Sequence, residues 1–238
     1  MVDGLALGGG QLPLGIELSL ETRLDDFLPG PNAEALATAN ALAEGRWQSN
    51  LYLAGASATG KTHLLQGVSH AASAMGRQVA YLPLSRPEMR DPELLAGWAG
   101  FDVVCLDDLQ SVAGEMAWER ALFRLYEDMR EAGGQLVFAA DEPPASLDLC
   151  LPDLASRLAA GPVYRLEPLD DDDLGEALRL RLARRGLSLP DDSARWLMRR
   201  VRRDMHSLTR LADRLDHLSL TAQRGLTIPF LRQVLDDT

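Results

Sequence analysis

The sequence predicts an α/β fold in which a five-stranded parallel sheet is followed by a small helical domain. Five short apolar runs, each as long as a buried strand, alternate with segments whose apolar residues recur at helical spacing. After residue 168 only the helical periodicity continues. Strands that alternate with helices are typical of a parallel sheet covered on both faces. With 238 residues, 46% of them hydrophobic, the chain is long enough to bury a core in each part.

The expected elements follow in chain order. A helix rich in Ala and Leu begins after Pro31, over residues 32–43. Strands are expected at 51–54, 79–84, 102–106, 136–140 and 163–166, and amphipathic helices at 62–75 and 118–132. Further helices are expected at 170–186, 191–203 and 207–223, with Pro190 marking a boundary. We therefore expect three parts: a flexible leader over 1–20, an α/β base over 21–168 and a helical domain over 169–238.

Composition argues against several classes of protein. A formal net charge of −11 does not suit a protein that grips DNA phosphates, so we expect no direct DNA binding. The two cysteines, Cys105 and Cys150, fit neither a disulfide framework nor a metal site. The sequence contains no run of about 18 apolar residues and no signal peptide. A cytoplasmic protein without a membrane partner is the expectation.

The segment Gly-Ala-Ser-Ala-Thr-Gly-Lys-Thr at residues 55–62 is a complete G-x-x-x-x-G-K-[ST] phosphate-binding loop. Gly55 and Gly60 allow backbone amides to turn toward phosphates, and the helix that follows adds its positive end. Lys61 is expected to reach the β- and γ-phosphates of a purine nucleotide, and the Thr62 hydroxyl to ligate Mg²⁺. Lys61 is also the one lysine among 24 basic residues, at a place where a compact ammonium suits phosphate oxygens.

Carboxylates follow two of the expected strands. Asp107 and Asp108 come directly after an apolar run, where a buried strand delivers acidic side chains to a metal at its C-terminal end. Asp107 is expected to orient Mg²⁺ through water, and Asp108 to position the attacking water. Asp141 ends another expected strand. It either contacts the γ-phosphate region or caps the turn before the prolines that follow.

Arg157 lies just before the last expected strand, too far along the chain from the phosphate loop to be expected at this chain's own nucleotide. One interpretation is an arginine finger that acts in trans on a neighbour's nucleotide, a kind of residue worth roughly 10³–10⁵ in rate. The alternative is an ordinary arginine on the surface of a helix.

Together these motifs resemble the AAA+ family, and within it the bacterial replication initiator DnaA and its regulatory paralogues. The resemblance runs from about residue 23 to the C-terminus. Residues 24–32 resemble the segment that binds the nucleotide base, which implies base contacts for Phe27 and Asn32. Residues 107–110 resemble the metal-binding strand end, 141–144 the sensor I turn, and Ser156 with Arg157 the arginine-finger box. The helical domain would then be the AAA+ lid.

The resemblance also implies ligands for this chain. They are ATP or ADP, with ADP favoured in the working form, and Mg²⁺ held by Thr62 and Asp107. One position departs from the family pattern, because His206 stands where sensor II normally supplies an arginine. That departure suits a protein that holds ADP structurally and works on a partner.

The leader contains Gly-Gln-Leu-Pro-Leu-Gly-Ile at residues 10–16. This segment is similar to the Q-L-x-L peptides that dock in the hydrophobic pocket of the DNA polymerase sliding clamp. Gln11 would hydrogen-bond at the pocket rim, while Leu12, Leu14 and Ile16 would fill an apolar groove. The alternative is a leader segment that binds nothing.

The resemblance implies a clamp-tethered regulator that stimulates hydrolysis of DnaA-bound ATP and so prevents re-initiation of chromosome replication. Its own ATPase activity would be slow at most, since the catalytic gain belongs to a composite site. The alternative is an autonomous AAA+ ATPase, such as a helicase loader or remodelling factor that assembles on its own copies. A homodimer is one option for either function. A DNA-binding initiator fragment is a third class, which the acidic charge disfavours.

Overall fold

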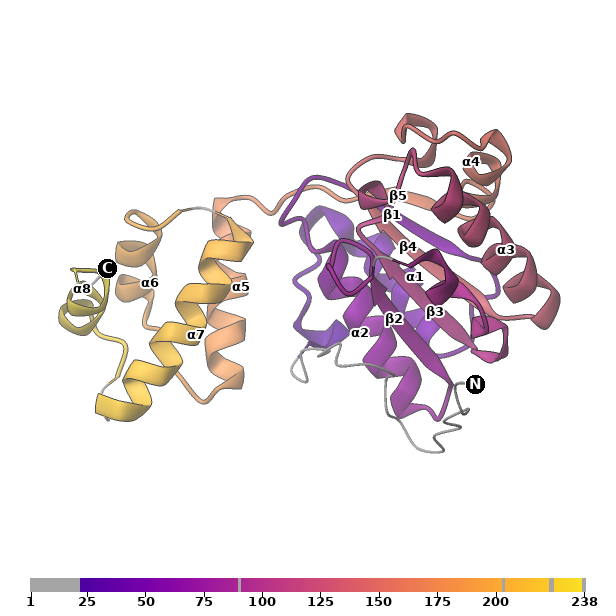
Figure 1. Ribbon diagram of the computed structural model, residues 1–238. Coiled ribbons are helices and arrows are strands. Elements are labelled where there is room, and N and C mark those ends of the chain that lie inside the picture. The colour runs from indigo at the N-terminus through magenta and orange to yellow at the C-terminus, as the bar shows by residue number, and fades with distance from the viewer. Residues whose placement is uncertain (1–21, 90, 203, 223–224, 237–238) are drawn as a thin grey trace. The chain divides into compact units, whose positions relative to one another are not determined.

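The computed structural model describes residues 22–89, 91–202, 204–222 and 225–236, without the side chains of 206, 220–222 and 236. The described residues form two compact units (Figure 1). The α/β unit comprises mainly Asn32–Ser57 and Lys61–Leu166. The helical unit comprises the residues from Glu167 onward together with Asp25–Pro31 and Ala58–Gly60. Each unit is described by itself below.

The α/β unit contains one sheet of five parallel strands, which confirms the predicted fold class. The strands are β1 (Leu51–Ala54), β2 (Val79–Pro83), β3 (Val103–Asp107), β4 (Gln135–Ala140) and β5 (Val163–Arg165). Their order across the sheet is β2-β3-β4-β1-β5, so β1 lies between β4 and β5. Because all five strands run the same way, the residues that follow β1, β2, β3 and β4 meet at one edge of the sheet.

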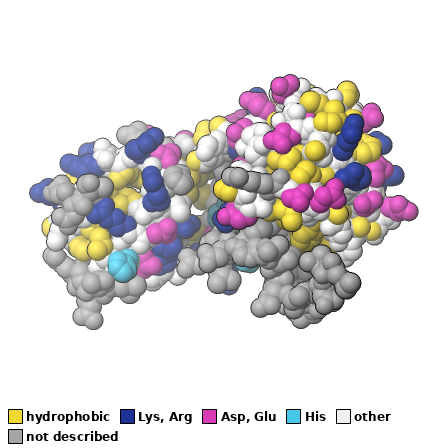
Figure 2. Space-filling view, viewed as in Figure 1, with side chains coloured by type: hydrophobic (Ala, Val, Ile, Leu, Met, Phe, Trp, Pro, Cys, Tyr) yellow, Lys and Arg dark blue, Asp and Glu magenta, His cyan; other side chains and the backbone are white. Residues whose placement is uncertain are grey.

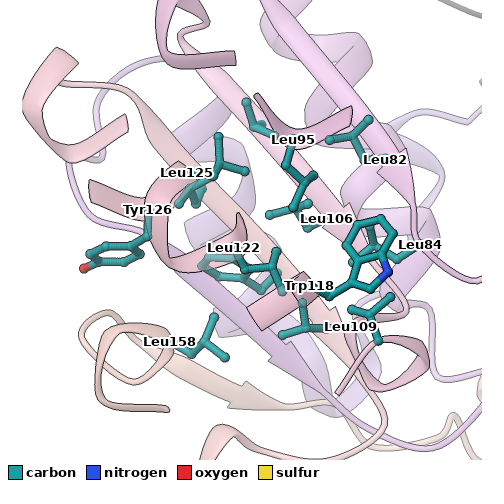
Figure 3. Close-up of a cluster of buried hydrophobic side chains, with 14 of the residues drawn as sticks. Leu82, Leu84, Leu95, Leu106, Leu109, Trp118, Leu122, Leu125, Tyr126 and Leu158 are labelled. Atoms are coloured by element: carbon teal, nitrogen blue, oxygen red, sulfur yellow. The ribbon is translucent and has the colours of Figure 1, made fainter. Parts of the chain in front are cut away.

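Four helices accompany this sheet: α1 (Ala33–Ala43), α2 (Lys61–Ala74), α3 (Met116–Ala132) and α4 (Pro152–Leu158). One face of the sheet packs against α3 and α4 through a continuous hydrophobic cluster. Figure 3 shows part of it, in which Leu82 and Leu106 come from the sheet and Leu122 and Leu125 from α3. Residues of opposite parity on the same strands face α2, because side chains alternate along a strand. Burial on both faces explains why β1 to β4 are largely apolar, whereas the edge strand β5 is exposed at Val163 and Arg165.

The helical unit contains α5 (Asp171–Arg184), α6 (Asp191–Met198), α7 (Met205–Ala222) and α8 (Ile228–Asp236). It has its own apolar core, in which Leu182, Leu197 and Leu215 are fully buried. Asp170 caps α5, since its side chain accepts hydrogen bonds from the backbone N–H groups of Asp172 and Asp173.

Two features of the helical unit differ from the sequence-based expectation. The helix expected over 191–203 ends at Met198, and the next one begins at Met205. Asp204 accounts for the start of the second helix, because its carboxylate accepts from the backbone N–H and the hydroxyl of Ser207 and so caps α7. The second feature is α8, which the prediction omitted. Its nine residues are too few for a clear periodic signal, and Pro229 obscures its start.

Charge is distributed unevenly along the chain. From residue 168 onward there are 13 Arg and 12 Asp or Glu, so this part is close to neutral and the net charge of −11 comes from the residues before it. Figure 2 shows Arg side chains on the helical unit with acidic side chains between them. Several are paired, as in the contacts of Arg179 with Asp191 and of Arg185 with Asp213. This surface is therefore mixed in charge rather than a basic patch. None of the described helices is sufficiently long and apolar to span a membrane.

Candidate nucleotide site and arginine finger

The predicted phosphate loop connects β1 to α2. Gly60 adopts a φ of +99°, and a Cβ atom at this position would lie 2.6 Å from Cε2 of the buried Phe27 ring. Both the backbone conformation and the close ring therefore require glycine there. Ala58 also has a positive φ, +66°, which is strained for a residue with a side chain. Strain of this kind is concentrated at functional loops.

Lys61 is the first residue of α2, and its side chain is only 7% exposed. Its ammonium donates to the carbonyl oxygens of Gly55 and Ala56, at 2.5 and 3.0 Å, and to Oδ1 of Asp141 at 3.0 Å. The ammonium is thereby held on the inner side of the loop. Since all three partners are oxygen acceptors, phosphate oxygens can replace some of them without leaving the charge unpaired.

Asp107, the last residue of β3, is buried and lies within a set of hydrogen bonds. Oδ2 accepts from the Tyr81 hydroxyl at 2.8 Å, Oδ1 accepts from the backbone N–H of Asp108 at 3.1 Å, and the Thr62 side chain also hydrogen-bonds the carboxylate. Burial raises the pKa of Asp107 above its ordinary value, while the hydrogen bonds from Thr62 and Tyr81 act in the opposite direction. The predicted metal pair of Thr62 and Asp107 is therefore in direct contact.

Asp108 occupies the left-handed region, with φ of +59°. This conformation turns its carboxylate toward neighbours that differ from those of Asp107. Oδ2 accepts from the Ser85 hydroxyl at 2.5 Å, and Oδ1 from the Gln110 amide at 3.3 Å. Two donors from separate loops thus orient the carboxylate that the sequence analysis assigns to the attacking water.

Asp141 follows β4 and is linked to both halves of the site. Its carboxylate pairs with Lys61, and its backbone N–H donates to Oε1 of Gln110 at 3.3 Å. Gln110 in turn donates to Asp108. A continuous polar chain therefore runs from the ammonium of the phosphate loop to the carboxylate after β3.

Thr62 and Asp107 fit a Mg²⁺ site in the chemistry of their donors, which are a hydroxyl and a carboxylate oxygen. Within the described part of the chain, no group of three or more His, Cys, Asp or Glu residues could hold a metal by itself. A cation held here would thus take its remaining ligands from water and phosphate. Mg²⁺ is commonly bound in that way, through one or two protein ligands and substrate phosphates.

Arg157 lies on α4 and is 45% exposed. Its Nε donates to Oε1 of Glu127 at 2.7 Å, and its guanidinium lies about 6 Å from the ring centroids of Phe123 and Tyr126, at 5.9 and 6.0 Å. Arg157 is therefore held against α3, apart from the hydrogen-bond network that joins Lys61 to Asp108. Its half-exposed position suits both of the interpretations made from the sequence.

The other predicted site residues are placed less completely. Phe27 packs against Gly60 in the helical unit, and Asn32 is buried immediately before α1. His206 is in α7, and its side chain is outside the described part of the structure. The proposed clamp-binding residues also lie outside the described residues: Gln11, Leu12, Leu14 and Ile16.

Four site residues were not assigned roles from the sequence: Tyr81, Ser85, Gln110 and Glu127. Tyr81 lies in the middle of β2 and Ser85 follows its end, and the register that places Pro83 beside Asp107 brings both side chains to the carboxylates. That register is a property of the sheet, so no local pattern could have identified them. Glu127 meets Arg157 through the packing of α3 against α4.

Two known protein families match this chain. The family described as Bacterial DnaA ATPase domain matches residues 18–164, and the family described as Hda, lid domain matches residues 170–235. The first match alone covers more than half of the chain. This chain belongs to the bacterial DnaA ATPase-domain family. Its AAA+ base is thus of the DnaA type, and its lid is of the Hda type.

Solved structures of DnaA and of another AAA+ protein have the same fold. Domain III of Thermotoga maritima DnaA has a TM-score of 0.76 at 22% identity, covering 93% of this chain and 98% of that one. AMPPCP-bound DnaA from Aquifex aeolicus has a TM-score of 0.68 at 22% identity, and the match covers 82% of this chain and 65% of that one. The Thermotoga maritima RuvB branch migration motor has a TM-score of 0.67 at 19% identity, and the match covers 92% of this chain and 73% of that one. This chain therefore spans about two thirds of the Aquifex DnaA chain.

Proposed function

We propose that this DnaA-related protein is a regulator that stimulates hydrolysis of the ATP bound to DnaA. Tethered to a DNA-loaded sliding clamp through Gln11 and Leu12, it would dock on ATP-bound DnaA and present Arg157 to the shared nucleotide. An arginine supplied in trans stabilises the charge that develops on the transferred phosphoryl group. DnaA would then hold ADP and be inactive for re-initiation.

The chain's own site would hold ADP or ATP. Lys61 would contact the phosphates, Thr62 and Asp107 would hold Mg²⁺, and Phe27 and Asn32 would lie near the base. A bound Mg²⁺ ion supplies charge neutralisation for the phosphates. Asp141 keeps a carboxylate next to Lys61, which disfavours a third phosphate and supports ADP as the resting ligand. On this proposal the nucleotide stabilises the shape that docks on DnaA.

The observation that carries the proposal is the combination of a DnaA-type base and an Hda-type lid in one chain that offers a half-exposed arginine on α4. The acidic charge also supports a protein partner over DNA, since contacts with a phosphate backbone require a cationic surface.

The proposal is tested with DnaA preloaded with labelled ATP, incubated with this protein in the presence or absence of DNA-loaded clamp. We expect hydrolysis to accelerate only when the clamp is present. Arg157→Ala and a Gln11→Ala/Leu12→Ala double variant should each abolish the acceleration. Arg46→Ala, which changes an exposed arginine next to Glu44, is the matched control and should behave as wild type. If DnaA's ATP persists with the wild-type protein, the proposal is wrong.

The second candidate is an autonomous ATPase that assembles on its own copies. The contact of Thr62 with Asp107 and the oriented carboxylate of Asp108 favour it, since both are needed for turnover in cis. It predicts steady ATP hydrolysis by the purified chain alone, which Asp108→Asn would abolish. In the preloaded-DnaA assay it predicts no acceleration.

A further inference from the structure

Arg157 is surrounded by three side chains from α3. Phe123, Tyr126 and Glu127 are spaced three and four residues apart and so lie on one face of the helix. Both rings lie near the guanidinium, with centroids 5.9 and 6.0 Å from Cζ, and Glu127 accepts a hydrogen bond from Nε. Aromatic faces and a carboxylate both favour a guanidinium, so the three together restrict a long side chain to a small region.

Glu127 engages Arg157 through one oxygen only. Its other oxygen, Oε2, accepts from Nε and Nη2 of Arg130 at 3.2 and 2.7 Å. Arg130, and after it Arg157, lowers the pKa of the Glu127 carboxyl, so the group stays ionised at neutral pH. The bidentate bridge that would occupy both ends of the Arg157 guanidinium is therefore not formed.

The contact leaves the outer edge of Arg157 available. Within the described part of the chain, Nε is the one guanidinium atom of Arg157 with a hydrogen-bond acceptor, while Nη1 and Nη2 have none. These two nitrogens form the fork that binds phosphate oxygens. An arginine fixed at Nε with its fork unoccupied is prepared to donate to a second molecule.

We propose that Glu127 is the positioning residue of the arginine finger, which it holds at Nε so that both Nη groups face the partner's nucleotide. This inference rests on the proposed function, because it gives Arg157 the role of the finger. If Glu127 instead kept Arg157 away from the partner, its carboxylate would be expected to bind the Nη groups. In the described structure it binds Nε.

The test measures single-turnover hydrolysis of DnaA-bound ATP at increasing concentrations of this protein on DNA-loaded clamp, which gives a maximal rate and a half-saturating concentration. For Glu127→Ala we expect the maximal rate to fall about tenfold, because an unfixed arginine spends less time in the productive geometry. The half-saturating concentration should stay within about twofold, since few docking contacts are lost. Glu127→Gln, which keeps an acceptor for Nε, should recover most of the rate.

Three variants separate the possible outcomes. Glu131→Ala removes an exposed carboxylate one turn further along α3 and should match wild type. Arg157→Ala should abolish stimulation. The double variant Glu127→Ala/Arg157→Ala should behave like Arg157→Ala alone. If Arg157→Ala has no effect, the proposed function itself fails. If Arg157→Ala abolishes stimulation but Glu127→Ala leaves the maximal rate unchanged or raises it, the positioning role alone is wrong. Equal melting temperatures of the variants would show that the fold is intact.

Discussion

Lys61 and Asp141 form an ion pair, 3.0 Å from Nζ to Oδ1, between the start of α2 and the end of β4. The sheet register produces it, because β1 and β4 are parallel neighbours in which Ala54 lies beside Ala140. Lys61 is buried whereas the Asp141 side chain is 50% exposed, so water and ligands reach the carboxylate more easily than the ammonium. The pair therefore places a negative charge beside the group that is proposed to hold phosphates.

We expect Lys61→Ala and Lys61→Arg each to weaken nucleotide binding by about 10- to 100-fold, because each substitution removes charge-assisted hydrogen bonds to the phosphates. Arginine should not substitute, because Nζ is enclosed by the carbonyls of Gly55 and Ala56 and a planar guanidinium is wider. Titration with a fluorescent ADP analogue gives the affinities, with Arg46→Lys as the matched surface control. A Lys61→Arg protein that binds as tightly as wild type would contradict the assignment.

Asp141→Asn should change nucleotide selectivity rather than abolish binding. The substitution removes a negative charge next to Lys61, so ATP, which carries the extra phosphate, should gain more than ADP. We expect the ratio of ATP affinity to ADP affinity to rise by about fivefold. This is the size expected when the repulsion between two charges that water partly screens is removed. Competition titrations with both nucleotides measure this ratio. Glu142→Gln, at the next residue, is the control, and a fall in ATP affinity for Asp141→Asn would mean that Asp141 supports the third phosphate.

Much of the fold could be predicted because its signals are contiguous. The four strands β1 to β4 are largely apolar runs, since they are buried on both faces, and the phosphate loop is a single eight-residue segment. The helix boundary at Met198 could not be predicted in this way. The sequence around it continues the helical period, and the start of the next helix, α7, depends on the cap that Asp204 provides.

The polar contacts of the site were the less predictable part. Asp107 was predicted to be a site residue from its place after a strand, but its partner Tyr81 is 26 residues away and reaches it through the register of β2 and β3. Glu127 and Arg157 are 30 residues apart and meet because α3 packs on α4. Such contacts depend on tertiary packing, which short-range periodicity does not encode.

The burial of Asp107 leads to a prediction about pH and stability. Its pKa in the folded state is raised by burial, so the folded protein binds its proton more tightly than the unfolded chain does. The folded protein therefore loses stability as pH rises from the ordinary pKa of aspartate through the raised pKa of Asp107. The cost of burying the ionised carboxylate is still present at neutral pH. Asp107→Asn removes the ionised form and should raise the melting temperature of the Mg²⁺-free protein by a few degrees at pH 7.5.

The measurement is a series of thermal melts without Mg²⁺ or nucleotide between pH 5 and pH 8. The gain for Asp107→Asn should be largest at the high end and should shrink as pH falls, because wild-type Asp107 then becomes protonated. Asp102→Asn, at an exposed position before β3, is the control. A variant that is less stable than wild type at pH 7.5 would show that the hydrogen bonds from Tyr81 and Thr62 outweigh the cost of burial.

Glu119 is fully buried, and its carboxylate secures the loop that leads into α4. It accepts hydrogen bonds from the backbone N–H groups of Gly114, Cys150 and Leu151, at 2.8, 3.0 and 2.7 Å. Glu119→Ala would leave these donors without partners and should cost about 3 kcal/mol of stability, roughly 1 kcal/mol for each lost bond. Glu119→Gln keeps one acceptor oxygen and should cost about half as much.

Urea unfolding followed by far-UV circular dichroism measures these differences, with the exposed Glu115→Ala as the control that should stay within about 0.5 kcal/mol of wild type. The same carboxylate holds the residues immediately before the helix that carries Arg157. Under the proposed function, Glu119→Gln should therefore also lower the stimulation of DnaA under conditions in which the protein is fully folded. If Glu119→Gln loses stability but keeps full stimulation, the loop before α4 is not needed to orient the finger, and the contact of Glu127 with Arg157 is sufficient by itself.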